Sequence, residues 1–279
     1  MKLIADSGSS KTEWCLFAAD GGVPENALSA GINPFYQELT DIEKVLMELP
    51  EWEGIQEVWF YGAGCAGEAQ RNKLVTALEG RFPSARVEVE SDLLGAARGL
   101  CGRSEGLVAI LGTGSNSCHY NGREIVEHIS PLGFILGDEG SGAVLGRKLV
   151  SAVFKRQLPA DLSAAFVGRY DLSALQVVER VYRQPFPNRF LAGFVPFILE
   201  HLEVSVVRRL VRESFVEFFD RNILLYPGHR ELPLHFTGSV AWFFRELLEE
   251  VALEKGCRLG AVRRSPMEAL MVFHAAERD

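Results

Sequence analysis

The stretch LIADSGSSKTEW (residues 3–14) places one aspartate and a run of serine, glycine and lysine directly after a short apolar strand. Glycine tolerates positive φ angles and lets backbone amides come close to an anion. Successive amides can then form a concave nest that binds phosphate. A plain hairpin turn has the same composition, so these residues alone leave both interpretations open.

Similar turns follow two later strands. The segment 106–130 predicts a strand, the turn GTGS, a second strand, an Asn-Gly turn and a third strand, because asparagine and glycine both tolerate positive φ. A Thr-Gly-Ser turn surrounds Gly238. One such turn is more often a hairpin. Three in one chain favour phosphate binding, because the turns around Gly8 and Gly114 also occupy the same place in two successive units of similar pattern. The Walker pattern G-x-x-x-x-G-K-S/T is absent, which excludes a P-loop protein.

Strands and helices alternate over the first third of the chain, which indicates an α/β layer. We expect strands at 2–6, 13–19, 26–31, 57–64 and 85–91 and helices at 38–49, 68–81 and 92–101. Beyond the 106–130 segment the chain is mostly helical. An amphipathic helix over 204–219 has its apolar residues at helical spacing, and a closing helix covers 265–276.

The composition excludes several classes of protein. The 279 residues, 47% hydrophobic and 24% charged, suit one large or two medium globular domains, and the net charge of -8 disfavours a nucleic-acid partner. No apolar run approaches the roughly 18 residues that span a bilayer, and no secretory signal opens the chain, so we expect a cytoplasmic protein without membrane contact. The cysteines are scattered without a C-x-x-C pair, which fits reduced thiols better than disulfides or a zinc site: Cys15, Cys65, Cys101, Cys118 and Cys257.

The stretch GAGCAG (62–67) offers a competing interpretation. It fits G-x-G-x-x-G after a predicted strand and before a predicted helix, and Glu88 and Glu90 follow at the distance of a ribose-binding acid. Against a nicotinamide enzyme, the motif lies on the fourth predicted strand rather than the first. It also leaves the two matching turns unexplained, so a dinucleotide oxidoreductase remains a minor alternative.

Other positions have both a structural and a functional interpretation. Asp92 opens the helix 92–101 at the carboxyl end of a strand, so it is either an N-cap, which its position favours, or a base for a substrate hydroxyl. Asp138 and Glu139 lie between glycines at a helix start and either complement the helix dipole or bind sugar hydroxyls. Asn33, which precedes a proline, is by default a turn residue.

Five motifs occur in the order DSGSSKT, SDLLGAA, LGTGSNS, GDEGSG and TGSVA. Together they resemble the sugar-kinase branch of the actin, Hsp70 and hexokinase superfamily, and more closely the N-acetylglucosamine kinase and BadF/BadG/BcrA/BcrD ATPase family, across almost the whole chain. The chain also looks like small Bacteroidetes-type amino-sugar kinases, including N-acetylmuramic acid kinases. The resemblance implies two ribonuclease-H-like (actin-like ATPase) α/β domains with a cleft between them, at 1–105 plus about 265–279 and at 106–264 with a helical insertion.

The same resemblance implies roles for individual residues. Asp92 would be the catalytic base, which reverses the preference for a cap, and Asp6 would hold Mg²⁺ through water. ATP and its phosphates would contact the three small-residue turns, at Gly8, Ser9, Ser10, Lys11, Thr12, Thr113, Gly114, Gly238 and Ser239. The amino sugar would contact Asn33, Ser115, Asn116, Gly133, Phe134, Asp138 and Glu139.

The implied activity is the phosphorylation of N-acetylglucosamine on its 6-hydroxyl, with ATP and Mg²⁺ as cofactors. Some relatives carry tryptophan at the position of Phe134, and phenylalanine lacks its N–H donor, so N-acetylmuramic acid remains an alternative sugar. An alternative of another class is a BadF-type ATPase switch, an iron–sulfur protein, although the cysteines here show no recognisable cluster site. The sequence does not give the oligomeric state, and a homodimer is compatible with it.

Overall fold

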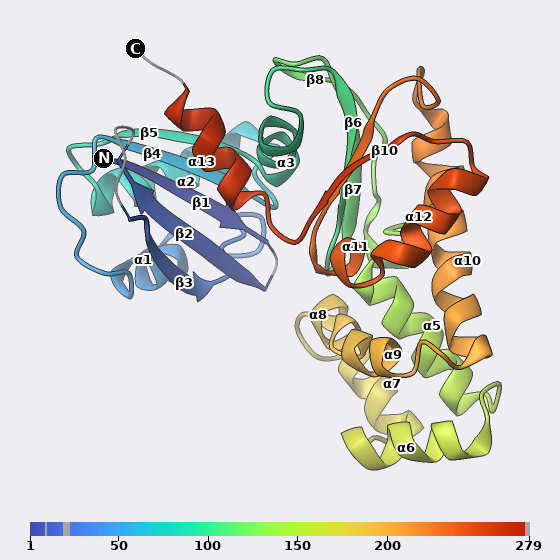
Figure 1. Cartoon of the computed structure of the whole chain (residues 1–279). Coiled ribbons are helices and arrows are strands. Elements are labelled where there is room, and N and C mark those ends of the chain that lie inside the picture. Colours follow the sequence, from blue (N-terminus) through green and yellow to red (C-terminus); the bar gives the residue numbers. More distant parts are fainter. Residues whose placement is uncertain (9, 19–22, 277–279) are drawn as a thin grey trace. The chain divides into compact units, whose positions relative to one another are not determined.

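The computed structural model describes residues 1–8, 10–18 and 23–276. The chain divides into two compact units, whose elements are labelled in Figure 1. Unit 1 comprises Met1–Val108, Cys118–Val126 and Ser265–Asp279, and unit 2 comprises Ala109–Ser117 and Glu127–Arg264.

The first sheet lies in unit 1 and has the strand order β3-β2-β1-β4-β5. Its strands are β1 (Lys2–Ser7), β2 (Lys11–Phe17), β3 (Glu25–Ala30), β4 (Glu57–Gly62) and β5 (Arg86–Ser91). β2 pairs antiparallel with β1 and with β3, whereas β4 pairs parallel with β1 and with β5. The register sets Ser7 beside Gly62 and Gly62 beside Ser91. The carboxyl ends of three parallel strands therefore meet at one edge, where ligands bind in α/β sheets.

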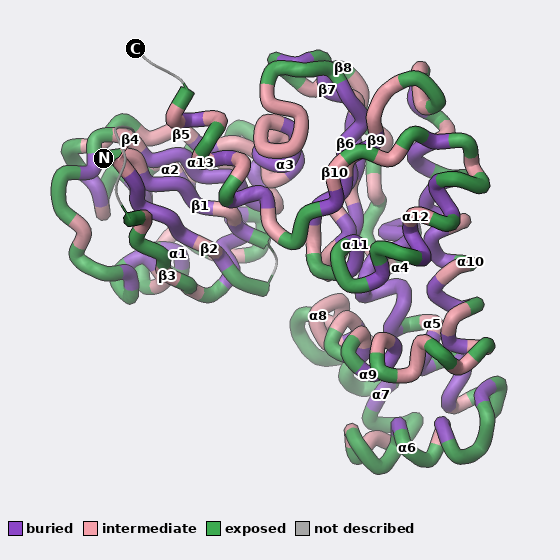
Figure 2. Tube along the Cα trace, viewed as in Figure 1, coloured by how far each residue is buried: buried purple, intermediate pink, exposed green. Residues whose placement is uncertain are grey.

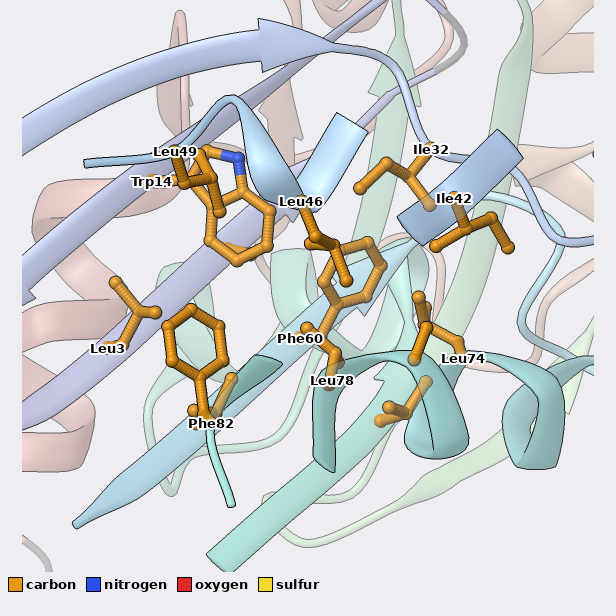
Figure 3. Packing of buried hydrophobic residues seen from close by; sticks show 14 of the residues in the cluster. Leu3, Trp14, Ile32, Ile42, Leu46, Leu49, Phe60, Leu74, Leu78 and Phe82 are labelled. Carbon is orange, nitrogen blue, oxygen red and sulfur yellow. The ribbon is translucent and has the colours of Figure 1, made fainter. Parts of the chain in front are cut away.

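One face of this sheet packs against α1 (Leu39–Met47) and α2 (Glu68–Arg81). Figure 3 shows the strand and helix side chains that meet there, among them Leu3, Trp14, Phe60, Ile42, Leu46, Leu74 and Leu78. None of these seven side chains is more than 1% exposed. Each contributes about 1.5–3 kcal/mol by leaving water, so this face forms the main core of unit 1.

The opposite face of the sheet is covered by α3 (Asp92–Cys101) and the C-terminal α13 (Met267–Ala275). Successive strand residues point to opposite faces, and those that point here pack against Met267 and Leu270: Ile4, Cys15, Phe17, Trp59 and Tyr61. A side chain at Gly99 of α3 would touch both Pro266 and Leu270. The last helix of the chain therefore completes the unit formed by the first hundred residues (Figure 1).

The second sheet has the order β10-β9-β6-β7-β8. Its strands are β6 (Gly106–Leu111), β7 (Ser115–Tyr120), β8 (Ile125–His128), β9 (Leu234–Thr237) and β10 (Leu259–Arg263). The three strands predicted in the 106–130 segment are confirmed, as is the strand before Gly238. β10, which pairs parallel with β9, is an element that the sequence pattern did not reveal.

The helices of unit 2 are α4 (Gly133–Leu136), α5 (Gly142–Phe154), α6 (Ala160–Tyr170), α7 (Ala174–Tyr182), α8 (Pro187–Ala192), α9 (Val195–Glu200), α10 (Ser205–Arg221), α11 (Ser239–Phe243) and α12 (Arg245–Glu254), with a 3₁₀ turn at Ile223–Leu225. Phe218 and Phe219 of α10 contact Phe236 of β9. A cluster of aromatic rings joins α6 to α8 and α9: Phe166, Tyr170, Phe190, Phe194 and Phe197.

The expected α/β class is confirmed, because both sheets are mixed in strand direction or order and carry helices. Figure 2 shows that the central strands β1, β4 and β6 are largely buried, whereas α6 is largely exposed. Over the stretches that the structure describes, no helix combines the length and the hydropathy that a membrane span requires. All five cysteines are free thiols.

Candidate active site

Two aspartates lie at the carboxyl edge of the parallel strands in unit 1. Asp6 is the second-last residue of β1, opposite Tyr61 of β4. Asp92 follows the last residue of β5 and opens α3. The two carboxylates influence one another electrostatically, since the charge of Asp92 helps to raise the pKa of Asp6. The sheet register thus brings together two residues that are far apart in the sequence.

The N-cap of α3 is Ser91, not Asp92. The Ser91 hydroxyl accepts the Leu94 N–H at 3.2 Å, which is the usual capping bond. Asp92 is the first helical residue, and its Oδ1 accepts the neighbouring Leu93 N–H at 2.9 Å. Burial raises the pKa of Asp92 to about 6, although this backbone bond acts in the opposite direction. The capping interpretation of Asp92 is therefore wrong, and its buried carboxylate, with a pKa raised to about 6, can accept a proton.

Burial also raises the pKa of Asp6, to about 7, and the carboxylates of Asp92 and Glu13 add to the effect while Lys11 opposes it. A hard oxygen donor among like charges suits a divalent cation, which would relieve their repulsion. In the part of the chain with described side chains, no group of three or more His, Cys, Asp or Glu residues could hold a metal by itself. A single carboxylate such as that of Asp6 still fits Mg²⁺, because this ion usually keeps several waters and is bound through one or two carboxylates together with phosphate oxygens.

The first small-residue turn joins β1 to β2. The Gly8 N–H donates to the Lys11 carbonyl at 3.1 Å and closes the turn, with Gly8, Ser10 and Lys11 exposed. Ser9 lies outside the described residues. Thr12, also expected at phosphate, is buried, and its hydroxyl donates to the Ala30 carbonyl at 3.1 Å. We therefore expect the Thr12 hydroxyl to stabilise the turn through this buried hydrogen bond rather than to contact phosphate, while the exposed residues face solvent.

Asn33 begins a tight turn after β3. Its Oδ1 accepts the Phe35 N–H at 3.0 Å, and its own N–H donates to Gln37 Oε1 at 2.6 Å. Ile32, just before it, is fixed through both backbone groups: the Ser7 hydroxyl donates to Ile32 O at 2.9 Å and accepts from Ile32 N at 3.0 Å. Asn33 is only 8% exposed. The backbone at this position is therefore held firmly.

The second small-residue turn follows β6 in unit 2. The Gly112 N–H donates to the Gly114 carbonyl at 2.9 Å, and the start of α5 closes on the same turn, since Ala143 N donates to Thr113 O at 3.0 Å. Asp138 lies against it: a Cβ at Gly114 would sit 3.0 Å from Asp138 Oδ2. Burial raises the pKa of Asp138 to about 6, while a hydrogen bond from the Ser115 backbone lowers it. The structure thus brings the turn and this carboxylate together.

Glu139, the neighbour of Asp138, faces other protein groups. Its Oε1 pairs with the Arg221 guanidinium at 2.5 Å, and its Oε2 accepts from Asn222 Nδ2 at 3.3 Å. Both oxygens are engaged at the end of α10, so a direct bond to a sugar hydroxyl is not favoured by this geometry. Asn116 is partly engaged as well, because its Oδ1 accepts from Ser117 N and lies 2.8 Å from His128 Nε2.

Gly133 and Phe134 open the short helix α4. The backbone at its start has positive φ angles, with 59° at the N-cap Leu132 and 74° at Gly133. Arg147 of α5 donates to the Phe134 carbonyl at 2.8 Å and to the Ile135 carbonyl at 3.3 Å. This arginine, which sequence reasoning missed, fixes the orientation of the turn that carries Phe134.

Gly238, in the third small-residue turn, lies against the backbone of Leu111 and Gly112 at the start of the second turn. Gly238 has a φ of 109°, and a Cβ there would lie 2.3 Å from the Leu111 carbonyl, so only glycine fits. Its N–H donates to Arg263 O at 3.1 Å, and the exposed Ser239 opens α11. The turns after β6 and β9 therefore meet at one edge of the second sheet.

Comparison with solved structures gives a match over the entire chain. A protein from Porphyromonas gingivalis, provisionally assigned as an N-acetylglucosamine kinase, is 48% identical, with 99% of each chain covered and a TM-score of 0.95. The chain belongs to the N-acetylglucosamine kinase family. A scan against models of known families gives no match, and a search of curated proteins gives none either.

More distant structures share the fold of this kinase family. A provisional N-acetylglucosamine kinase from Chromobacterium violaceum is 20% identical, with 98% of each chain covered and a TM-score of 0.76. A ROK family glucokinase from Streptomyces griseus, solved in complex with glucose and AMPPNP, is 16% identical, with 98% of this chain and 97% of that chain covered and a TM-score of 0.61. The expected actin-like sugar-kinase fold is thereby confirmed.

Proposed function

We propose that this protein is an ATP-dependent amino-sugar kinase that transfers the γ-phosphoryl group of ATP to the 6-hydroxyl of N-acetylglucosamine. The 48% identity over the full length of the Porphyromonas gingivalis protein supports the substrate class. The observation that carries the chemistry is the position of Asp92 at the carboxyl end of β5. Ser91, not Asp92, caps α3, and the pKa of the Asp92 carboxylate is raised to about 6.

Asp92 acts as the general base in this proposal. Phosphoryl transfer needs positioning and charge neutralisation more than covalent help from the protein. The sugar oxygen bonds to the γ-phosphorus as the bond to the β,γ-bridging oxygen breaks, and Asp92 takes the hydroxyl proton. A base with a pKa near the working pH combines the correct protonation state with useful driving force. The products are the sugar phosphate and ADP.

The glycine-rich turns bind the nucleotide in this proposal. The Gly8–Lys11 turn and the Gly112–Gly114 turn would lie against the phosphate oxygens, and Lys11 would add a positive charge. Gly238 and Ser239 would contact the adenosine. Asp6 would hold Mg²⁺ through water, and the ion would neutralise charge on the nucleotide's phosphates.

The sugar in this proposal is bound by Asn33, Asp138 and the backbone around Gly133. Phe134, half-buried and fixed through Arg147, supplies an apolar wall. Ser115 and Asn116 would lie near the phosphate and the sugar. Glu139 acts indirectly, because its ion pair with Arg221 holds the segment that carries Asp138.

The test is ADP release by the purified protein with ATP and Mg²⁺, with and without N-acetylglucosamine, and again with N-acetylmuramic acid. Sugar-dependent ADP with N-acetylglucosamine as the better acceptor is the expected result. A preference for N-acetylmuramic acid would keep the kinase and change the sugar. ADP release that ignores both sugars would replace the kinase with an ATPase switch.

A further inference from the structure

The GAGCAG loop (62–67) is left without a role by the proposed function. It follows β4, and its Ala63 N–H donates to the Ser7 carbonyl at the end of β1, at 2.9 Å. Gly64 has a φ of 79°, in the left-handed region that favours glycine. The loop therefore lies at the same sheet edge as Asp6 and Asp92, and its glycine is conformationally required.

Gly64 lies directly against the side chain of Asn33. A Cβ at Gly64 would come within 2.1 Å of Asn33 Oδ1, 2.9 Å of Cγ and 3.3 Å of Nδ2. All three are side-chain atoms of one residue, and they can move only by leaving the hydrogen bond from Phe35 N to Oδ1. Glycine at position 64 thus leaves free the space that the Asn33 carboxamide occupies.

Helix α2 fixes both sides of this contact. Arg71 donates to the carbonyls of Cys65 and Ala66, at 3.3 and 3.0 Å, and so holds the loop. Lys73, just over half a turn further along, donates to the carbonyls of Pro34 and Gln37, at 3.2 and 2.9 Å, and so holds the turn that Asn33 begins. Two cations of one helix therefore clamp the two segments whose contact is Gly64 with Asn33.

The clamped carboxamide retains an unused donor. Its Oδ1 is occupied by Phe35 N, whereas Nδ2 donates to no group within residues 1–8, 10–18 and 23–276. Asn33 as a whole is 8% exposed, and its Nδ2 is not fully buried, so an oxygen atom of a ligand can reach this donor. A hydroxyl or carbonyl oxygen of a ligand would satisfy it.

We propose that the loop 62–67 is an acceptor-positioning element in which Gly64, clamped by Arg71 and Lys73 of α2, sets the Asn33 carboxamide so that Nδ2 donates to the acceptor sugar. This inference rests on the proposed function and adds Gly64 as a specificity-determining position. It also gives the middle glycine of the GAGCAG stretch a role unrelated to dinucleotide binding.

The test is a double-mutant cycle of Gly64→Ala and Asn33→Ala, read as KM for N-acetylglucosamine and for ATP. G64A should raise the sugar KM about tenfold, the cost of one lost hydrogen bond, and leave the ATP KM within about twofold. In the N33A background the same change should have little further effect, because its target is already gone. An unchanged sugar KM in G64A, or effects that simply multiply, would overturn the inference.

Gly54→Ala is the matched control. Gly54 has a φ of 71°, close to that of Gly64, but a Cβ there meets no atom within 4 Å. G54A therefore carries the same backbone strain without the contact, and both KM values should match the parent. An equal loss of sugar affinity in G54A would attribute the effect to general destabilisation and overturn the inference.

A second pair of variants covers the case in which G64A fails to fold. Lys73→Met frees the turn that Asn33 begins and should raise the sugar KM severalfold, while Lys44→Met, on the exposed face of α1, should change neither KM. Equal sugar KM values for K73M and K44M would contradict the clamp. Failure of the proposed function is distinguishable, because it appears as absent sugar-dependent ADP in the parent, whereas failure of this inference appears only in the variants.

Discussion

At the scale of single residues, the position of one hydroxyl decides what Asp92 can do. Ser91 satisfies the Leu94 N–H at the start of α3, so the helix does not need the aspartate as its cap. Burial then raises the pKa of Asp92 to about 6 instead of leaving it a strong acid. Because Asp92 lies one residue after the N-cap position, it is a candidate base rather than a structural capping residue.

Asp92→Asn should lower kcat by roughly 100- to 10,000-fold, the usual contribution of a general base. The amide keeps the shape and an oxygen for Leu93 N, so ATP affinity measured by calorimetry should stay nearly intact. Loss of a buried charge should not lower the thermal midpoint. The matched control is Ser91→Ala, which costs about 1 kcal/mol of stability through the lost cap but should retain most of the turnover. Parent-like turnover in D92N would rule out the base.

At the scale of elements, the docking of α13 depends on a buried histidine. His274 is fully buried, with its Nε2 2.8 Å from the Tyr61 hydroxyl, to which Arg98 donates at 2.9 Å. Its ring lies 4.2 Å from that of Trp59, and Lys2 donates to its carbonyl at 3.1 Å. Burial, together with the charges of Arg98 and Lys2, lowers the pKa of His274 to about 3.

This pKa predicts acid sensitivity of unit 1. Because the folded-state value lies below the ordinary 6.5, the unfolded chain binds more protons below pH 6.5, and stability falls as the pH drops from 6.5 towards about 3. The loss from this group should reach about 2 kcal/mol at pH 5, since each unit corresponds to about 1.4 kcal/mol. His274→Gln keeps a partner for Tyr61 and removes the titration. Urea unfolding at pH 7.5 and pH 5 should therefore show a smaller difference for H274Q than for the parent. Equal differences would exclude His274 as the source.

At the scale of the whole molecule, the order of elements along the chain differs from their grouping in space. The last helix belongs to the unit built from the first residues, and strands β6 and β7 contribute residues to both units. Met267 and Leu270 of α13 close a core whose other members come from β1, β2 and β4. Unit 1 is therefore incomplete until the C-terminus has been made.

A chain that ends at Arg264 should be strongly destabilised. It loses the burial of Met267, Leu270 and His274 and exposes the strand residues beneath them. Two large buried apolar side chains correspond to about 5 kcal/mol, which for a domain of this size lowers the thermal midpoint by roughly 10–20 °C. Differential scanning calorimetry measures the shift. Removal of residues 277–279 alone, which retains α13, is the control, and an unshifted midpoint in the shorter chain would contradict the role of α13.

The sequence by itself determined the features that arise from neighbouring residues. Short apolar segments specified strands such as β1 and β4 of the first sheet. Glycine, serine and threonine marked the turns at Gly8, Gly114 and Gly238, because turn chemistry acts over a few residues. The family motifs added the choice of Asp92. These local signals were sufficient for the α/β class and for most helix and strand positions, although β10 and the separate helices α6–α9 carried no clear signal.

Only the tertiary structure decided which distant groups meet. It set Gly64 against Asn33, engaged Glu139 with Arg221, turned the Thr12 hydroxyl into the core, and gave the capping bond of α3 to Ser91. No local pattern encodes such pairs, because their partners are chosen by packing across strands and helices, and by the need of every buried polar group for a hydrogen bond. The sequence thus specified which residue types are present at the sheet edges, while the fold fixed which atoms remain available to a ligand.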